Sequence, residues 1–167
     1  MHTSLNLLST SVSEKLADYD DTLPRIYTKQ QTTDPGVVSS TSFANLAGTS
    51  LTIDLPRKAQ VEVSLNAWLN ISAFERGSVS MRVGVGVSGA NSIPPNEGIP
   101  DFSSGWGGVL YLATGAGGGT HQKSSVRLLE MNPGISTFTI QGMRSVTTVP
   151  MSVRYSYYIV KVLRWLD

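Results

Sequence analysis

The sequence predicts one compact antiparallel β-domain, a sandwich or jelly roll, preceded by an N-terminal arm. Two observations support this fold class: apolar residues recur at every second position in most of the chain, and turn residues separate the alternating stretches. A third observation is a change of composition near Asp34-Pro35-Gly36, before which few patterns are strong. We therefore place an arm at residues 1–36 and the β-domain at residues 37–167.

The alternation of apolar residues defines the expected strands. Within residues 61–69, for example, Val61, Val63 and Leu65 alternate with Glu62 and Ser64. This pattern is typical of an antiparallel strand with one face on a core. The expected strands are 51–55, 61–69, 79–87, 109–113, 122–130, 136–142 and 151–165.

Glycine and proline mark the connections between these strands. Residues 88–108 are rich in both and are expected to form a long irregular connection that also carries Phe102 and Trp106. These two aromatic residues either fold back over the mouth of the domain or contact a partner. Gly115–Gly119 is expected to be a loop tip, and Asn132-Pro133-Gly134 a turn.

The final expected strand carries apolar residues on both of its faces. One face holds Val153, Tyr155, Tyr157 and Ile159, and the other holds Tyr158, Val160 and Val162. Two apolar faces predict a central strand, or a strand whose outer face meets another subunit. A bulge that shifts the phase near Ile159 is the alternative, and both explanations stay open. The residues assigned to a subunit interface are Tyr155, Tyr157, Tyr158, Val160 and Val162.

The arm is polar and acidic, but it also holds apolar residues that a solvating tail does not need. Ser11 and Glu14 have the spacing of a capping box, which predicts a short helix over residues 12–19. Pro24 favours extended backbone around it. The arm is either a mobile tail or a segment that docks on a neighbouring subunit. Its anchors in the second case are Leu7, Leu8, Leu23, Ile26 and Tyr27.

Motifs for catalysis or for metal and cofactor binding are weak. Gly84, Gly86 and Gly89 have the spacing of a dinucleotide fingerprint, but they lie inside an expected strand and lead into a proline-rich loop. The chain has two histidines and no cysteine, and the histidines are not paired for a metal. Nothing local indicates the paired carboxylates of a glycoside hydrolase. We expect no catalytic residue, no metal and no cofactor.

Charge and hydropathy argue against two classes of partner. The net charge is +1, and the basic residues are scattered over several strands, so neither nucleic acid nor a membrane is an expected partner. No apolar run reaches the roughly 18 residues of a spanning helix. The N-terminus lacks the basic region of a secretory signal, so we expect synthesis in the cytoplasm without export by that route.

Six segments between residues 37 and 165 resemble, in order, the strands of a C1q/TNF-like jelly roll of the kind found in bacteriophage structural proteins. They are Ser42–Pro56, Ala59–Asn70, Ser78–Val87, Ser125–Leu129, Asn132–Gln141 and Ser152–Val162. The resemblance covers about three quarters of the chain. It consists of strand patterns and carries no catalytic signature.

The resemblance implies a homotrimer with the aromatic strands near the threefold axis, and no enzymatic activity. It implies a virion structural protein, namely a capsid decoration (cement) protein whose arm docks on the major capsid protein or on neighbouring subunits. The alternative is a receptor-binding head of a tail fibre or tail tip that meets a host-surface receptor. Residues 1–36 do not match the family domain, and no coiled coil precedes it, which favours decoration over a long fibre.

Overall fold

The computed structural model describes residues 25–31, 36–95 and 109–166. The helix expected over residues 12–19 lies outside these ranges. So do the arm anchors Leu7, Leu8 and Leu23, and the loop residues Phe102 and Trp106. The elements of the described ranges are all strands. No described segment forms a helix that is long and apolar enough to span a membrane.

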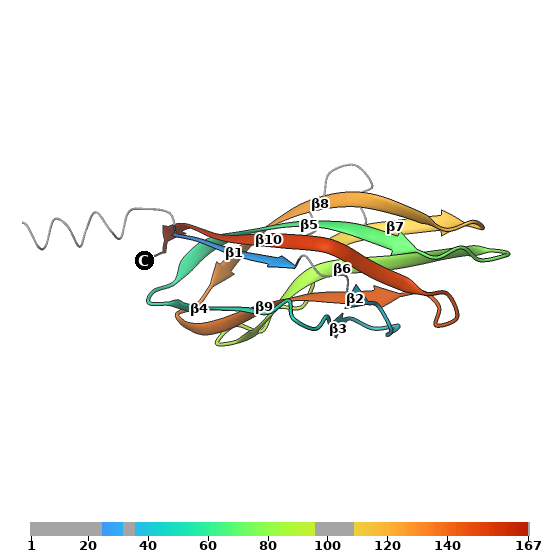
Figure 1. Ribbon diagram of the computed structural model, residues 1–167. Coiled ribbons are helices and arrows are strands. Elements are labelled where there is room, and N and C mark those ends of the chain that lie inside the picture. The colour runs from blue at the N-terminus through green and yellow to red at the C-terminus, as the bar shows by residue number, and fades with distance from the viewer. Residues whose placement is uncertain (1–24, 32–35, 96–108, 167) are drawn as a thin grey trace, which may run out of the picture.

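The strands of the described residues form two antiparallel sheets, which stack as the two layers of a sandwich (Figure 1). Sheet A has the strand order β1-β10-β5-β8, and β2 also pairs with β10; sheet B has the order β3-β9-β6-β7, and β4 also pairs with β9. The strands are β1 (Arg25–Gln31), β2 (Gly36–Val37), β3 (Ala44–Asn45), β4 (Leu51–Leu55), β5 (Ala59–Ile71), β6 (Ser78–Gly89), β7 (Val109–Gly115), β8 (Gly119–Met131), β9 (Gly134–Arg144) and β10 (Met151–Trp165).

The order of strand pairing identifies the fold as a jelly roll. β6 pairs with β7, β5 with β8, β4 with β9 and β1 with β10, so the chain is one long antiparallel ribbon with its tip between β6 and β7. Successive pairs of this ribbon lie alternately in sheet B and sheet A. A ribbon wound in this way is the double-sheet jelly roll. The predicted fold class, an antiparallel jelly-roll sandwich, is confirmed.

The inner faces of the two sheets form one apolar core. In β5, Val61, Leu65 and Leu69 are each 1% exposed or less; every second residue of the strand is buried, and the residues that alternate with them are exposed or half-buried. In sheet B, Phe138 and Ile140 of β9 belong to the same core. Burial of apolar surface stabilises a fold by roughly 25 cal/mol per Å², so the period-two pattern of the sequence fixes which face of each strand is buried.

The two glycine-containing turns predicted from the sequence each connect a strand of one sheet to a strand of the other. Gly118, between β7 and β8, has a φ of 71°, and an added Cβ would lie 2.5 Å from the carbonyl oxygen of Ile71. Gly134 follows the β8 strand with a φ of 112°. These backbone angles are in the left-handed region that glycine enters without a steric penalty.

The sandwich begins before the boundary that the sequence suggested at residue 36. β1 pairs with β10 from Arg25 opposite Val162 to Gln31 opposite Ser156. Tyr27 packs against the core, whereas Ile26 points outward and is 59% exposed. Because adjacent strand residues point to opposite faces, these two neighbouring apolar residues do not show an alternation in the sequence. The domain therefore includes residues that the sequence assigned to the arm.

Candidate interaction surface

Exposed large hydrophobic side chains gather on the outer face of sheet A. The described residues include eight exposed large hydrophobic side chains. Seven of them lie on this face, and the eighth, Ile135, lies on the outer face of sheet B. The seven are Ile26 and Val37 of the edge strands, Trp68 of β5, Val126 and Leu128 of β8, and Tyr155 and Tyr157 of β10. Single exposed apolar residues are common on proteins, but a gathering on one face marks an interaction site.

A β-bulge in β10 brings its tyrosines to this face. Arg154 pairs with Trp68 and Tyr157 pairs with Asn66, so Tyr155 and Ser156 together lie opposite one residue of β5. Tyr155 has a φ of 44°, in the left-handed region. The extra residue shifts the phase of burial along β10, because a bulge inserts one residue into a period of two. The outward side chains are therefore consecutive at Arg154 and Tyr155.

The position of β10 and its bulge together explain why this strand has apolar residues on both faces. β10 is a central strand of sheet A, as one explanation predicted, and it also contains a bulge, located at Tyr155 rather than near Ile159. Tyr158, Val160 and Val162 are at most 2% exposed and belong to the core of their own chain. Their assignment to a subunit interface is therefore corrected. Tyr155 and Tyr157 remain exposed, at 62% and 43%.

Tyr158 fixes β10 by reaching across the sandwich. Its hydroxyl oxygen lies 2.8 Å from the carbonyl oxygen of Thr49 and 3.0 Å from that of Phe138, so its one proton is shared between two backbone acceptors of the opposite layer. Burial raises the pKa of Tyr158 above its ordinary value, because the apolar surroundings disfavour the phenolate. This bond holds the inner side of β10 in place while its outer side presents Tyr157.

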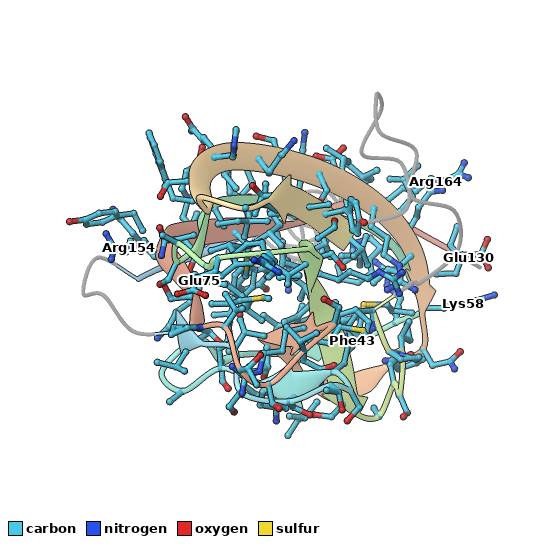
Figure 2. The ribbon with its side chains drawn as sticks, turned by 90° about the vertical axis from the view of Figure 1, so that its right-hand side faces the viewer. Phe43, Lys58, Glu75, Glu130, Arg154 and Arg164 are labelled. Carbon is cyan, nitrogen blue, oxygen red and sulfur yellow. The ribbon has the colours of Figure 1, made fainter. Side chains whose placement is uncertain are left out.

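A hollow of about 190 Å³ lies beside the bulge on the outer face of sheet A. Its lining comes from β1, β5, β8 and β10 and contains no charged residue: Gln30, Asn66, Ala67, Trp68, Gln122, Tyr155, Ser156 and Tyr157. Aromatic walls with a few amide groups fit an uncharged ring that carries a polar substituent. A second hollow, of about 300 Å³, lies further along the strand between Val37, Asn70 and Arg154. Arg154 lies at the periphery of the molecule (Figure 2).

Charged and amide side chains border the face at the end where β5 begins. Lys58 and Glu130 form an exposed ion pair with a separation of 3.4 Å, and they lie together at one side of the molecule (Figure 2). The Nε of Arg164 donates a hydrogen bond of 3.0 Å to Gln60. Charged residues also lie within the face, because Lys161 of β10 and Glu62 of β5 pair with each other between the edge strands β1 and β8.

The residues that the sequence raised for chemistry do not come together. Within the described ranges, no group of three histidine, cysteine, aspartate or glutamate residues is placed to hold a metal ion. His121 is exposed on β8. Gly84 and Gly86 lie inside β6, as expected for strand residues, and the side chain of Gln141 lies over Gly86, where an added Cβ would approach it to 2.7 Å.

Comparisons with known proteins found similarity in the fold and not in the sequence. No protein-family model matches the chain, and no curated protein matches its sequence. A chain in the structure of infectious bursal disease virus Gx strain is 13% identical, with a TM-score of 0.51 over 83% of this chain and 32% of the viral one. The protein thus spans about a third of that viral chain. At this identity the likeness shows the jelly-roll fold alone.

Two weaker structural matches have the size of this domain. Eiger TNF from S. frugiperda is 11% identical, with a TM-score of 0.46 over 87% of this chain and 95% of its own. The globular domain of zebrafish complement 1qA protein is 10% identical, with a TM-score of 0.41 over 86% of this chain and 98% of its own.

Proposed function

We propose that this chain is a virion structural protein of a bacteriophage, a trimeric capsid decoration protein that associates with itself through the outer face of sheet A. The observation that carries the proposal is the gathering of seven exposed large hydrophobic side chains on that one face. The fold shared with a chain of a virus structure and the resemblance to phage jelly rolls support the virion role. Fold alone is a weak guide to function, so the surface carries most of the weight.

The outer face of sheet A has the size of a protein interface. β5 and β8 are 13 residues long, which is about 43 Å at about 3.3 Å per residue, and four strands side by side span about 19 Å. The face therefore offers on the order of 800 Å² per subunit. A standard interface buries about 800 Å² of each partner.

The aromatic residues are the expected energetic centre of this contact. Trp68, Tyr155 and Tyr157 surround the hollow, and tryptophan and tyrosine are the residue types most enriched among interface positions that dominate affinity. Val126 and Leu128 extend the apolar area along the edge strand β8. The proposal uses the exposed side of sheet A and leaves the core of each subunit unchanged.

The arm would provide the contact with the particle. The part of the arm that precedes the sandwich, residues 1–24, ends before Arg25. The guanidinium of Arg25 lies 5.5 Å from the centre of the Trp165 ring, and that of Arg57 lies 5.4 Å from the same ring centre. Residues 1–24 therefore leave the domain from an end that is held in place. A stretch of that length reaches up to about 80 Å when extended, enough to meet the major capsid protein or a neighbouring trimer. Leu7, Leu8 and Leu23 are its proposed anchors.

The first test is the molar mass of the purified protein, measured by light scattering after size-exclusion chromatography at several concentrations. We expect three times the chain mass of 17.9 kDa. A monomer at every concentration would contradict self-association through sheet A. Removal of residues 1–24 should leave a folded trimer that no longer binds capsids, and full capsid binding by the truncated protein would contradict the role of the arm.

The second candidate function is a receptor-binding head of a phage tail. The uncharged hollow favours it, because aromatic walls with amide groups also suit a sugar ring. Gold-labelled antibody on intact virions separates the two functions, since a decoration protein labels capsid faces and a receptor-binding head labels tail ends. Binding of the isolated protein to host cells would favour the tail.

A further inference from the structure

We infer that Tyr155 of one copy inserts into the hollow of a neighbouring copy, so that each copy donates one ring and receives another. This contact would exist only if the protein self-associates as proposed, and it would determine how two copies meet. Its premises are the backbone of Tyr155, the shape and chemistry of the hollow, and the position of both on one face.

The backbone of Tyr155 indicates that this side chain serves something beyond its own fold. It is the only non-glycine residue of the described ranges with a positive φ, at 44°. A left-handed conformation is strained for an L-residue because its Cβ crowds the backbone, and glycine avoids that strain. Bulges with a left-handed first residue usually place glycine there. The tyrosine is 62% exposed, so packing within its own chain offsets little of that strain.

The hollow has room for a phenol ring. Its volume is about 190 Å³, and an engineered apolar cavity of about 150 Å³ already binds benzene. Trp68, Tyr157 and the base of the copy's own Tyr155 supply aromatic walls, and no charged side chain lines the hollow. An incoming ring would therefore lose water without burying a charge, which is the favourable case for an aromatic anchor.

The amide groups of the hollow match the hydroxyl of a tyrosine. Asn66 accepts a hydrogen bond from Ser124 through its Oδ1, which leaves its amide nitrogen to donate. The side chains of Gln30 and Gln122 make no hydrogen bond to another described residue, and each offers both a donor and an acceptor. A tyrosine hydroxyl entering here would find partners of both kinds, as a buried hydroxyl requires.

A second copy of the chain fits these features better than an unrelated partner does. The protruding ring and the hollow lie side by side on the same face, so a rotation that closes a ring of subunits can bring each Tyr155 to the next hollow. The same contact would cover the exposed Val126 and Leu128, which a small ligand in the hollow would leave in water.

The experiment measures association of the full chain by light scattering over a dilution series, for the parent protein and for Tyr155→Gly. We expect the variant to keep its fold, because glycine tolerates this φ, and to associate about thirtyfold or more weakly, as for loss of an interface hot spot. Tyr155→Phe should keep most of the association. Ile135→Ala, on the other sheet, is the matched control and should change nothing.

A second variant tests the receiving side of the contact. Gln122→Trp leaves Tyr155 intact and fills the hollow, so it should weaken association to a similar degree.

The outcomes separate this inference from the proposed function. An oligomeric parent with an equally oligomeric Tyr155→Gly overturns the inserted ring and leaves self-association standing. A monomeric parent overturns both. Unchanged association together with loss of binding to a glycan array or to phage particles would show that a different partner occupies the hollow, and that result also overturns the inference.

Discussion

The two outer faces of the sandwich cover the same core but treat their side chains differently. On sheet B, hydroxyl and amide groups bond to one another: Thr52 to Thr137 at 2.9 Å, Ser50 to Thr139 at 3.0 Å, and Gln141 to Asn45 at 2.8 Å. On sheet A, some polar pairs also form, but tyrosine, tryptophan and branched aliphatic residues stay exposed between them. The difference supports the proposal that sheet A, and not sheet B, is the interaction face.

The proposed difference between the two outer faces is tested most directly by placing a charge on each face in turn. Val126→Lys on sheet A should reduce the oligomer to a monomer, because a charge buried at an interface without a partner is strongly unfavourable. Ile135→Lys on sheet B, where the parent residue is even more exposed, should leave the molar mass unchanged. Light scattering gives both masses. Equal behaviour of the two variants would remove the distinction between the faces.

The next largest effect is expected from the hydrogen bond that the Tyr158 hydroxyl makes between the two layers. Tyr158→Phe removes the hydroxyl that reaches Thr49 and Phe138 and should lower the free energy of unfolding by about 1–3 kcal/mol, since two buried carbonyl groups lose their shared donor. Tyr157→Phe, on the outer face, is the matched control and should change it by less than about 0.5 kcal/mol. Urea denaturation of both variants measures the difference, and similar losses would show that the buried hydroxyl contributes little.

The same hydroxyl predicts how stability depends on pH. The pKa of Tyr158 is raised by burial, so the folded protein keeps this proton at pH values where the unfolded chain, with an ordinary pKa of about 10, gives it up. Its contribution is complete below about pH 10 and is lost as the pH rises toward the folded pKa. The free energy of unfolding should therefore fall less steeply above pH 10 in Tyr158→Phe than in the parent. Parallel curves would argue against the raised pKa.

The smallest effect is expected at the charged border of sheet A. Lys58→Ala breaks the ion pair with Glu130, whose two side chains are exposed, and should cost no more than about 0.5 kcal/mol in low salt. Added salt should reduce even this difference, because it screens exposed charges. A loss above about 1 kcal/mol, measured by denaturation, would mean that this border is part of the stabilising structure of the domain.

Much of the fold follows from the period of two in the sequence, and the details that fail have a physical cause. The strand around Val61 follows the alternation along its whole length, because one buried face imposes it. The tyrosines of the last strand do not, since the bulge at Tyr155 depends on a backbone angle that the residue type disfavours. A phase shift of one residue then exchanges core and surface, which explains why Tyr158 was assigned to the outside.

The candidate site was predictable only in part. Tyr155 and Tyr157 were singled out as interface residues and are exposed, but Trp68 was recognised only as an alternating position in its strand. The hollow that joins them depends on the pairing of strands far apart in sequence, which no local pattern records. The edge strand β1 was missed as part of the domain because Ile26 and Tyr27, its two apolar neighbours, point to opposite faces.

The ribbon of paired strands has a consequence for synthesis on the ribosome. Among the described strands, β10 is synthesised last, yet it lies in the middle of sheet A, between β5 and β1. Until Met151–Trp165 have left the exit tunnel, one side of β5 has no strand to pair with, although the pairs β6–β7 and β5–β8 are already complete in the nascent chain. Pairing of distant segments is slow, and an open strand edge attracts other chains. We therefore expect the yield of soluble protein to rise when translation is slowed by cooling or when chaperones are co-expressed.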